Sequence, residues 1–277
     1  MYSIDYSNNN PIAVFDSGVG GLSVVKEIKG LIPGYPMLYF ADNAYAPYGF
    51  RTKEEIIERT VKISSFLINK GAAVIVVACN TATAAAVSTL RERFSIPFVG
   101  MEPAVKPAAA LSKTGVIGVL ATRGTLAGEL YNSTLERYAL GVKIIEKEGK
   151  GLAQLVEDGQ IDHPETERLL REYLEPMIAA GADHIVLGCT HYPFLIPAIK
   201  KVLASFNLPE TRVTIVDPAH AVAKQLVRIV KELDIPIETG SATNPLFFST
   251  GQNAVLKSFA RSIYYDIPDD NFSIIIT

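Results

Sequence analysis

The two cysteines of the chain, Cys79 and Cys189, occupy similar sequence contexts. Each follows a short apolar, β-branched run, and small polar residues come directly after it: Asn80 and Thr81 in the first case, Thr190 and His191 in the second. A free thiol has a pKa of roughly 8.5, so thiol and thiolate can both exist near neutral pH. Two thiols presented alike by two parts of one chain therefore suggest chemistry on both faces of one small substrate.

Simpler interpretations of the two thiols were weighed against this one. A free cysteine is most often a small buried apolar residue. A single disulfide would not resemble a small secreted scaffold. Zinc sites need three or four ligands at close spacing, and only His191 lies near a cysteine in the sequence, so we expect no metal. The repeated context after a buried strand favours chemistry over each of these alternatives.

The elements that would position the thiols are short β-rich runs alternating with longer helical patterns. This alternation predicts an α/β fold with largely parallel sheets covered by helices on both faces. The clearest helix is Lys53–Lys70, with a capping box formed by Thr52 and Glu55 and with Gly71 at its end. The predicted strands are Ile12–Asp16, Met37–Ala41, Ala73–Ala78, Gly115–Leu120, Val142–Glu146, His184–Gly188, Val213–Asp217 and Leu246–Ser249.

The length of 277 residues suggests about two domains. Prolines at 103 and 107 interrupt the pattern, and a second crossing is expected near Asp217. We therefore expect a discontinuous first α/β domain, residues 1–103 plus 217–277, and a second α/β domain, residues 104–216.

Charge and hydropathy exclude several partners. A net charge of −3 gives no electrostatic reason to bind nucleic acid or an anionic membrane. No apolar run approaches the eighteen or so residues that span a bilayer. The first ten residues lack the basic and apolar regions of a signal peptide. With two lone thiols, the expected location is the reducing cytoplasm.

Ligands of α/β sheets gather where strands end and helices begin, and four segments fit that position. Asp16 ends a strand and is followed by a glycine-rich turn. The case for a nucleotide-binding loop here is weak, because no P-loop or complete dinucleotide pattern is present. The segment Pro47-Tyr48-Gly49 would by itself be an ordinary turn. At the two cysteine segments, a helix N-terminus is expected to lower the thiol pKa and to receive a ligand carboxylate. His191 is placed to tune Cys189 or to shuttle a proton for it.

Together these segments resemble glutamate racemase, in that family's order and roughly its spacing. The resemblance starts near Ile12 and extends into the C-terminal part of the chain, where Phe247-Phe-Ser-Thr-Gly251 is also similar. It is carried by Asp16-Ser-Gly-Val-Gly-Gly21, Pro47-Tyr-Gly49, Ala78-Cys-Asn-Thr-Ala82 and Leu187-Gly-Cys-Thr-His-Tyr-Pro193.

The resemblance implies a cofactor-independent racemase that interconverts L- and D-glutamate. Its D-glutamate would supply bacterial peptidoglycan, and hence cell-wall biogenesis and cell shape. It further implies two pseudo-symmetric α/β domains with the substrate enclosed between them, and a homodimer.

The resemblance also implies a role for each matching residue. Cys79 and Cys189 match the two catalytic cysteines, which act on D-glutamate and L-glutamate respectively. Asp16 matches the residue assisting the first cysteine and His191 the residue assisting the second, with Glu157 as a further acid on the His191 side. The matching substrate-binding positions are Asp16, Ser17, Pro47, Tyr48, Gly49, Asn80, Thr81, Thr190 and His191.

Two segments depart from the family pattern. Relatives often have Asp-Thr-Ala-Arg before Pro-Tyr-Gly, whereas this chain has Asp42-Asn43-Ala44-Tyr45. The change removes a cation near the mouth of the site and is expected to affect loop closure or subunit contacts. Many relatives also have Cys-Pro ahead of the assisting glutamate, where this chain has Gly149 and Lys150.

Three other functions remain open from the sequence. A racemase for another acidic amino acid such as aspartate would differ in pocket geometry. A carboxylate-binding module without turnover would have little use for two intact cysteines and Asp16. A thiol hydrolase requires one activated nucleophile and leaves the second cysteine unexplained.

Overall fold

The computed structural model describes residues 10–207, 209, 212–234 and 244–275. The first nine residues, in which the sequence shows no signal-peptide pattern, lie outside the described residues. In chain order the elements are β1 (Ile12–Asp16), α1 (Leu22–Leu31), β2 (Met37–Ala41), η1 (Tyr48–Phe50), α2 (Lys53–Asn69), β3 (Val74–Val77), α3 (Asn80–Arg93), β4 (Phe98–Gly100), α4 (Val105–Leu111), β5 (Val116–Ala121), α5 (Arg123–Leu126), α6 (Glu129–Tyr138), β6 (Lys143–Glu148), α7 (Leu152–Glu157), α8 (Pro164–Ala179), β7 (His184–Gly188), η2 (Tyr192–Leu195), α9 (Ile196–Ala204), β8 (Thr214–Val216), α10 (Ala219–Glu232), β9 (Leu246–Ser249), α11 (Ala254–Ile263), η4 (Asp269–Asn271) and β10 (Phe272–Ile274).

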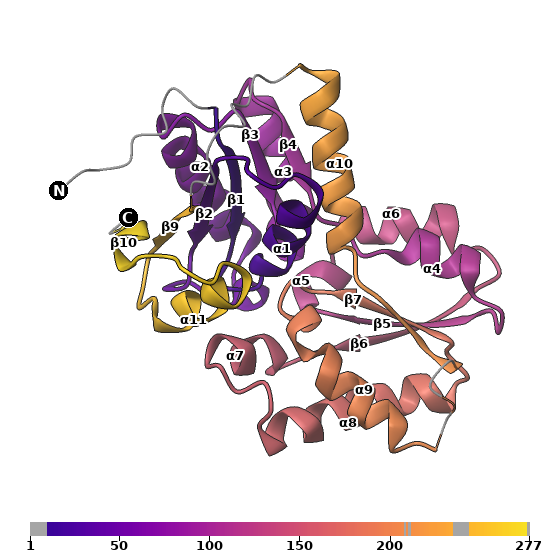
Figure 1. The fold of residues 1–277 in the computed structure, drawn as a ribbon. Coiled ribbons are helices and arrows are strands. Elements are labelled where there is room, and N and C mark those ends of the chain that lie inside the picture. The colour runs from indigo at the N-terminus through magenta and orange to yellow at the C-terminus, as the bar shows by residue number, and fades with distance from the viewer. Residues whose placement is uncertain (1–9, 208, 210–211, 235–243, 276–277) are drawn as a thin grey trace.

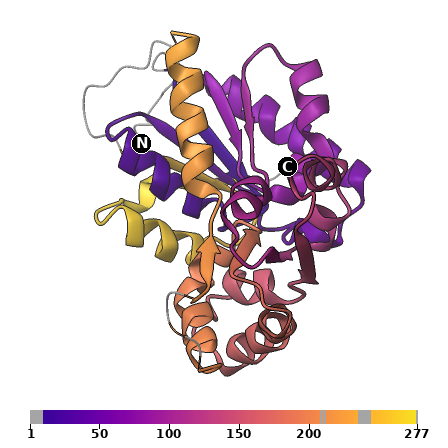
Figure 2. The same cartoon turned by 90° about the vertical axis from the view of Figure 1, so that its right-hand side faces the viewer.

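The strands of the described residues form two sheets. One has the order β10-β9-β2-β1-β3-β4 and the other β6-β5-β7-β8. Every strand pairing in both sheets is parallel, which confirms the predicted α/β class. The chain passes from the first sheet to the second after β4 and returns after β8, where α10 packs against α1 (Figures 1 and 2).

Strand β1 is apolar along most of its length because helices cover both of its faces. Its side chains alternate between the two faces of the sheet. Ile12 and Val14 pack on the side of α1 and α10, whereas Ala13 and Phe15 pack on the side of α2 and α3. All four are fully buried. In the second sheet the same division holds, with α8 and α9 on one face and α4 and α6 on the other.

All eight predicted strands agree with the structure to within one or two residues at each end, and four of them, Ile12–Asp16, Met37–Ala41, His184–Gly188 and Leu246–Ser249, have the predicted bounds. The predicted helix Lys53–Lys70 is α2, which ends one residue earlier; its capping box is present, since Thr52 Oγ1 accepts from the Glu55 amide and Glu55 accepts from the Thr52 amide. The sequence analysis missed β4 and β10. Both are three-residue edge strands, too short to show a recognisable period.

No helix in the described parts of the chain is long and apolar enough to cross a membrane.

Candidate active site

The carboxyl ends of β1, β3, β5 and β7 meet at one cavity between the two sheets. Asp16 ends β1, Cys79 follows β3, Thr122 follows β5 and Cys189 follows β7. Both thiols line the cavity, although they come from different sheets. Its walls are formed by Ser17, Pro47, Tyr48, Gly49, Cys79, Asn80, Thr81, Thr122, Ala153, Cys189, Thr190 and His191.

Cys79 is the N-cap residue of α3. Its Sγ accepts a hydrogen bond from the Ala82 amide at 3.4 Å and lies 3.8 Å from Ser17 Oγ. Burial raises the pKa of the Cys79 thiol to about 12, the negative charge of Asp16 adds to this, and the Ala82 amide only partly opposes it. The sequence analysis expected the helix N-terminus to lower this pKa. That expectation was wrong, because the loss of solvation outweighs the helix dipole at a side chain only 5% exposed.

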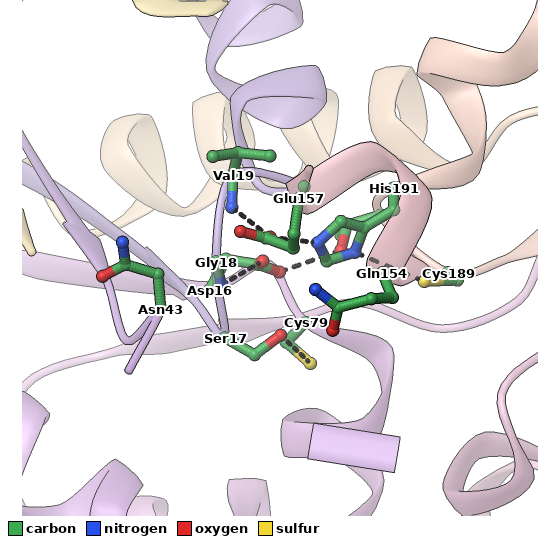
Figure 3. A network of polar contacts seen from close by, with 12 residues as sticks. Asp16, Ser17, Gly18, Val19, Asn43, Cys79, Gln154, Glu157, Cys189 and His191 are labelled. Atoms are coloured by element: carbon green, nitrogen blue, oxygen red, sulfur yellow. Dashed lines mark hydrogen bonds and ion pairs between the residues drawn. The ribbon is translucent and has the colours of Figure 1, made fainter. Parts of the chain in front are cut away.

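Cys189 begins a chain of three polar side chains (Figure 3). Its Sγ lies 3.5 Å from His191 Nδ1, and His191 Nε2 lies 2.5 Å from Glu157 Oε1. Burial alone would lower the pKa of His191, but the neighbouring Cys189 and Glu157 together raise it well above its usual range. The arrangement therefore favours an imidazolium beside the Cys189 sulfur, held in place by a carboxylate.

Asp16 contacts the other half of the site through hydrogen bonds. Its Oδ1 accepts from the Gly18 amide at 2.9 Å, and its Oδ2 accepts from Thr190 Oγ1 at 2.9 Å. The pKa of Asp16 is raised because burial outweighs the opposing effect of His191. Its effect on Cys79 is electrostatic, whereas its hydrogen bonds orient Thr190 next to Cys189.

The glycine-rich turn between β1 and α1 approaches the second sheet closely. The Val19 amide donates to Glu157 Oε1 at 2.7 Å, so this oxygen is shared with His191 (Figure 3). A Cβ atom on Gly18 would lie 1.8 Å from Glu157 Oε1, and one on Gly20 would lie 2.5 Å from Thr190 Oγ1. The glycines at these two positions therefore permit contact between the two halves.

The start of α3 supplies groups suited to a ligand carboxylate. Asn80 is 2% exposed, and within the described residues its side-chain nitrogen and oxygen have no hydrogen-bond partner. Such buried groups normally have partners, so a ligand would satisfy them. Thr81 Oγ1 lies 2.8 Å from Thr122 Oγ1. The sequence analysis missed Thr122; its position directly after a predicted strand was the only available signal.

Tyr48 is fixed to the end of β2 by a residue that the sequence analysis did not propose for the site. The Tyr48 hydroxyl donates to Asp42 Oδ2 at 2.5 Å, and Asp42 in turn pairs with Arg59 of α2. The guanidinium of Arg59 lies 3.8 Å from the ring centroid of Tyr45. Tyr45 occupies the position of the arginine in the family pattern described above. Its ring covers the guanidinium of Arg59, which comes from α2.

Gly149 is the second departure from the family pattern, and the space that a side chain at 149 would occupy is taken by Tyr192. The Tyr192 hydroxyl donates to the Gly149 carbonyl at 3.1 Å. A Cβ on Gly149 would lie 2.3 Å from that hydroxyl. The absence of a side chain at 149 thus lets Tyr192 approach the segment leading to α7.

Other parts of the molecule are less suited to chemistry. A hollow of about 560 Å³ near α9 and β8 is lined mainly by apolar residues and has one lysine, Lys200. Among the described residues that line it, no acid accompanies this lysine. In the described ranges, no three histidine, cysteine, aspartate or glutamate side chains are grouped so that they could hold a metal ion.

Comparisons with known proteins point to one family. The sequence model of the Asp/Glu/Hydantoin racemase family matches residues 22–226. A glutamate racemase of Roseiflexus sp. (strain RS-1) is 49% identical over 94% of this chain and 93% of its own length. The crystal structure of Francisella tularensis glutamate racemase in complex with D-glutamate has a TM-score of 0.80, 26% identity, and covers 96% of this chain and 97% of its own. The Escherichia coli glutamate racemase structure in complex with L-glutamate and the activator UDP-MurNAc-ala has a TM-score of 0.78, 33% identity, and coverage of 90% and 92%.

Proposed function

The chain belongs to the Asp/Glu/Hydantoin racemase family and is an amino-acid racemase, and we propose that it interconverts L- and D-glutamate without a cofactor, by proton transfer between Cα of the substrate and two cysteines. The observation that supports this most directly is that Cys79 and Cys189, from different sheets, line one cavity. The names of the relatives point to glutamate, and two of the similar structures hold its D- and L-forms.

The environments of the two thiols suggest which one starts each direction. In the free enzyme Cys79 is a thiol, because its pKa is raised to about 12. His191, whose pKa is raised well above its usual range, lies 3.5 Å from the Cys189 sulfur, and we propose that Cys189 is the base toward L-glutamate. In the L-to-D direction, the Cys189 thiolate removes the Cα proton and the Cys79 thiol donates a proton to the opposite face. Cys79 ends as thiolate and Cys189 as thiol, and the reverse reaction starts from that state.

The carbanionic intermediate needs stabilisation that no cofactor supplies. At the start of α3 the Ala82 amide donates to Cys79 Sγ, so the amides of Asn80 and Thr81 are the first-turn donors left for a ligand, and the Asn80 side chain belongs to the same turn. These groups can bind a substrate carboxylate and withdraw charge from Cα. Most of the residues that line the cavity are buried, and a site closed around the substrate would keep water from the carbanion. We assign substrate binding to Asp16, Ser17, Pro47, Tyr48, Gly49, Asn80, Thr81, Thr190 and His191, and assistance of proton transfer to Asp16, His191 and Glu157.

The experiment that tests this function is incubation of the protein with L-glutamate in deuterated water, without any added cofactor. We expect D-glutamate carrying deuterium at Cα. Aspartate measured in parallel distinguishes the alternative acidic substrate. Tight binding of D-glutamate without inversion would instead indicate a module that binds carboxylates only.

Substitution of each thiol separates the two bases. Cys79→Ala and Cys189→Ala should each lower racemisation in both directions by at least about 10³-fold, because inversion needs an acid and a base on opposite faces. Each variant serves as the control for the other: Cys79→Ala retains the group that deprotonates L-glutamate, and Cys189→Ala the group that deprotonates D-glutamate. Full activity of either variant would disprove the two-cysteine mechanism.

The wider setting is inferred from the family. We propose that the D-glutamate formed enters peptidoglycan, and that the enzyme is a cytoplasmic homodimer. We also propose that residues 1–103 with 217–277, and residues 104–216, are its two domains. The distribution of strands between the two sheets supports this division.

A further inference from the structure

Asp42 is a buried carboxylate directly behind the cavity, and the mechanism above does not use it. It follows β2 and is fully buried. Arg59 donates to it twice, from Nε to Oδ2 at 2.9 Å and from Nη2 to Oδ1 at 2.6 Å. Thr250 Oγ1 also donates to Oδ1, at 2.9 Å. A carboxylate with this many donors has a fixed position.

The remaining contact of Asp42 leads into the cavity. The Tyr48 hydroxyl donates to Asp42 Oδ2 at 2.5 Å. Tyr48 is only 2% exposed and, with its neighbours Pro47 and Gly49, forms one wall of the cavity. Pro47 caps the short 3₁₀ turn η1, Tyr48 and Gly49 are its first two residues, and the turn contacts α3 and α5.

On the basis of the proposed glutamate racemase function, we propose that Asp42 is a positioning residue that, clamped by Arg59, fixes the Pro47–Gly49 wall in the geometry that binds the substrate. Asp42 itself does not line the cavity. It acts through the Tyr48 hydroxyl, so its contribution is to substrate affinity and not to proton transfer at the thiols.

The surroundings of the ion pair keep it intact. Arg59 is 7% exposed, and its guanidinium lies against the ring of Tyr45. Desolvation strengthens a charge-assisted, two-pronged contact and also makes the loss of either partner costly. The pair is thus a buried support that is held by two hydrogen bonds and covered by an aromatic ring.

The C-terminal part of the chain also contributes to this support. The Ala44 amide donates to Thr250 Oγ1 at 3.1 Å, and the Gly251 amide donates to Asn43 Oδ1 at 2.9 Å. Residues that follow β9 therefore fasten the segment between β2 and η1. The segment Phe247–Gly251, which resembles the family's C-terminal segment, therefore has a structural role. Its last residues hold the loop that carries Tyr48.

The test compares steady-state kinetics of Asp42→Asn and Tyr48→Phe with those of the wild type, using L- and D-glutamate. Asp42→Asn keeps the shape and removes the charge, whereas Tyr48→Phe removes one hydroxyl and keeps the ion pair. Both should raise KM by about tenfold for both isomers, the range expected when a hydrogen bond to a charged group is lost. We expect kcat to change less than about threefold, and the double variant to be no worse than the weaker-binding single variant, since both changes weaken the same contact between Tyr48 and residue 42.

Asp183→Asn is the matched control. Asp183 is also a buried carboxylate with several donors, from Ser112, Lys113 and Thr114, but it lies at the amino end of β7, away from the cavity. Its loss should lower stability and leave KM unchanged. If Asp42→Asn and Tyr48→Phe behaved like this control, with lower kcat in proportion to folded protein and wild-type KM, Asp42 would be structural only.

Two further results separate the positioning role of Asp42 from the proposed racemase function. If Asp42→Asn does not fold, Tyr48→Phe alone decides, because it leaves the buried charges paired. Absence of glutamate turnover in the wild type would contradict the proposed function. Turnover in the wild type with unchanged KM in Tyr48→Phe would contradict only the positioning role.

Discussion

The two cysteines share a sequence context but have different chemical environments. Cys79 has a helix amide and a serine hydroxyl beside it, and its thiol is favoured by burial and by the charge of Asp16. Cys189 has an imidazole beside it whose own pKa is raised. Two strands from different sheets thus bring the two thiols to one cavity, and their neighbours give each thiol a different environment.

Glu157 should set the charge of His191. In Glu157→Gln the amide oxygen can still accept from Val19 and His191, so the contacts remain while the negative charge is lost. The pKa of His191 should then fall, because one of the groups that raise it is removed. As pH rises, His191 of the variant loses its proton earlier than in the wild type. NMR titration of ¹³C-labelled imidazole, assigned with His191→Asn, measures this.

The rate of L-glutamate turnover should follow the same change. A neutral His191 no longer stabilises the Cys189 thiolate, so kcat/KM of Glu157→Gln should drop by roughly 10- to 100-fold, less than the loss of an acid–base group itself. The control Glu165→Gln alters an exposed carboxylate on α8 and should change neither quantity. An unchanged His191 titration in Glu157→Gln would rule out the role assigned to its charge.

At the scale of elements, the sequence predicted those features that depend on neighbours in the chain. The strands around Cys79 and Cys189 and the capping box of α2 are local, and so are the turns after the strands. Arg59 is different: on an amphipathic helix it resembles a solvent-facing cation, and only the fold brings it to Asp42, seventeen residues away. Thr122 was missed for the same reason, since its partner Thr81 lies on α3, which follows a strand of the other sheet. Contacts between elements decide such positions, and periodicity carries no information about them.

The turn between β1 and α1 should depend on the absence of a side chain at Gly18. In Gly18→Ala the new methyl group would collide with the carboxyl end of Glu157. That end can rotate away, so we expect little change in the free energy of unfolding, but the contacts of Glu157 with Val19 and His191 would break. Activity should fall by roughly 10- to 100-fold at nearly unchanged Tm.

Gly30→Ala is the control for this substitution. Gly30 lies in α1, is exposed, and a Cβ there would meet no atom within 4 Å. Alanine should stabilise the helix by about 0.5–1 kcal/mol and leave turnover unchanged. Thermal unfolding and steady-state assays of the two variants give both quantities. Full activity of Gly18→Ala would show that the close approach has no role in catalysis.

At the scale of the whole molecule, the two sheets are joined at the cavity by hydrogen bonds from each side. The Val19 amide donates to Glu157, Thr190 Oγ1 donates to Asp16, and Ser23 Oγ donates to the Thr190 carbonyl at 3.2 Å. These contacts join the β1–α1 region of the first half to Glu157 and to Thr190, the residue after Cys189. A substrate bound between Cys79 and Cys189 would add further links between the same two halves, so binding and the joining of the halves should be coupled.

Hydrogen exchange in the presence of D-glutamate tests this coupling. At a concentration 100 times Kd, a ligand specific for the folded state stabilises it by about 2.7 kcal/mol. Amides at the start of α3, after Cys79, and at η2, after Cys189, should both exchange more slowly. The loop at Ser112–Thr114, at the opposite end of the second sheet, serves as the internal reference and should be unaffected unless exchange occurs by global unfolding. Protection confined to one half would mean that the substrate does not bridge the two cysteines, and the two-sided proton transfer would then lack its structural basis.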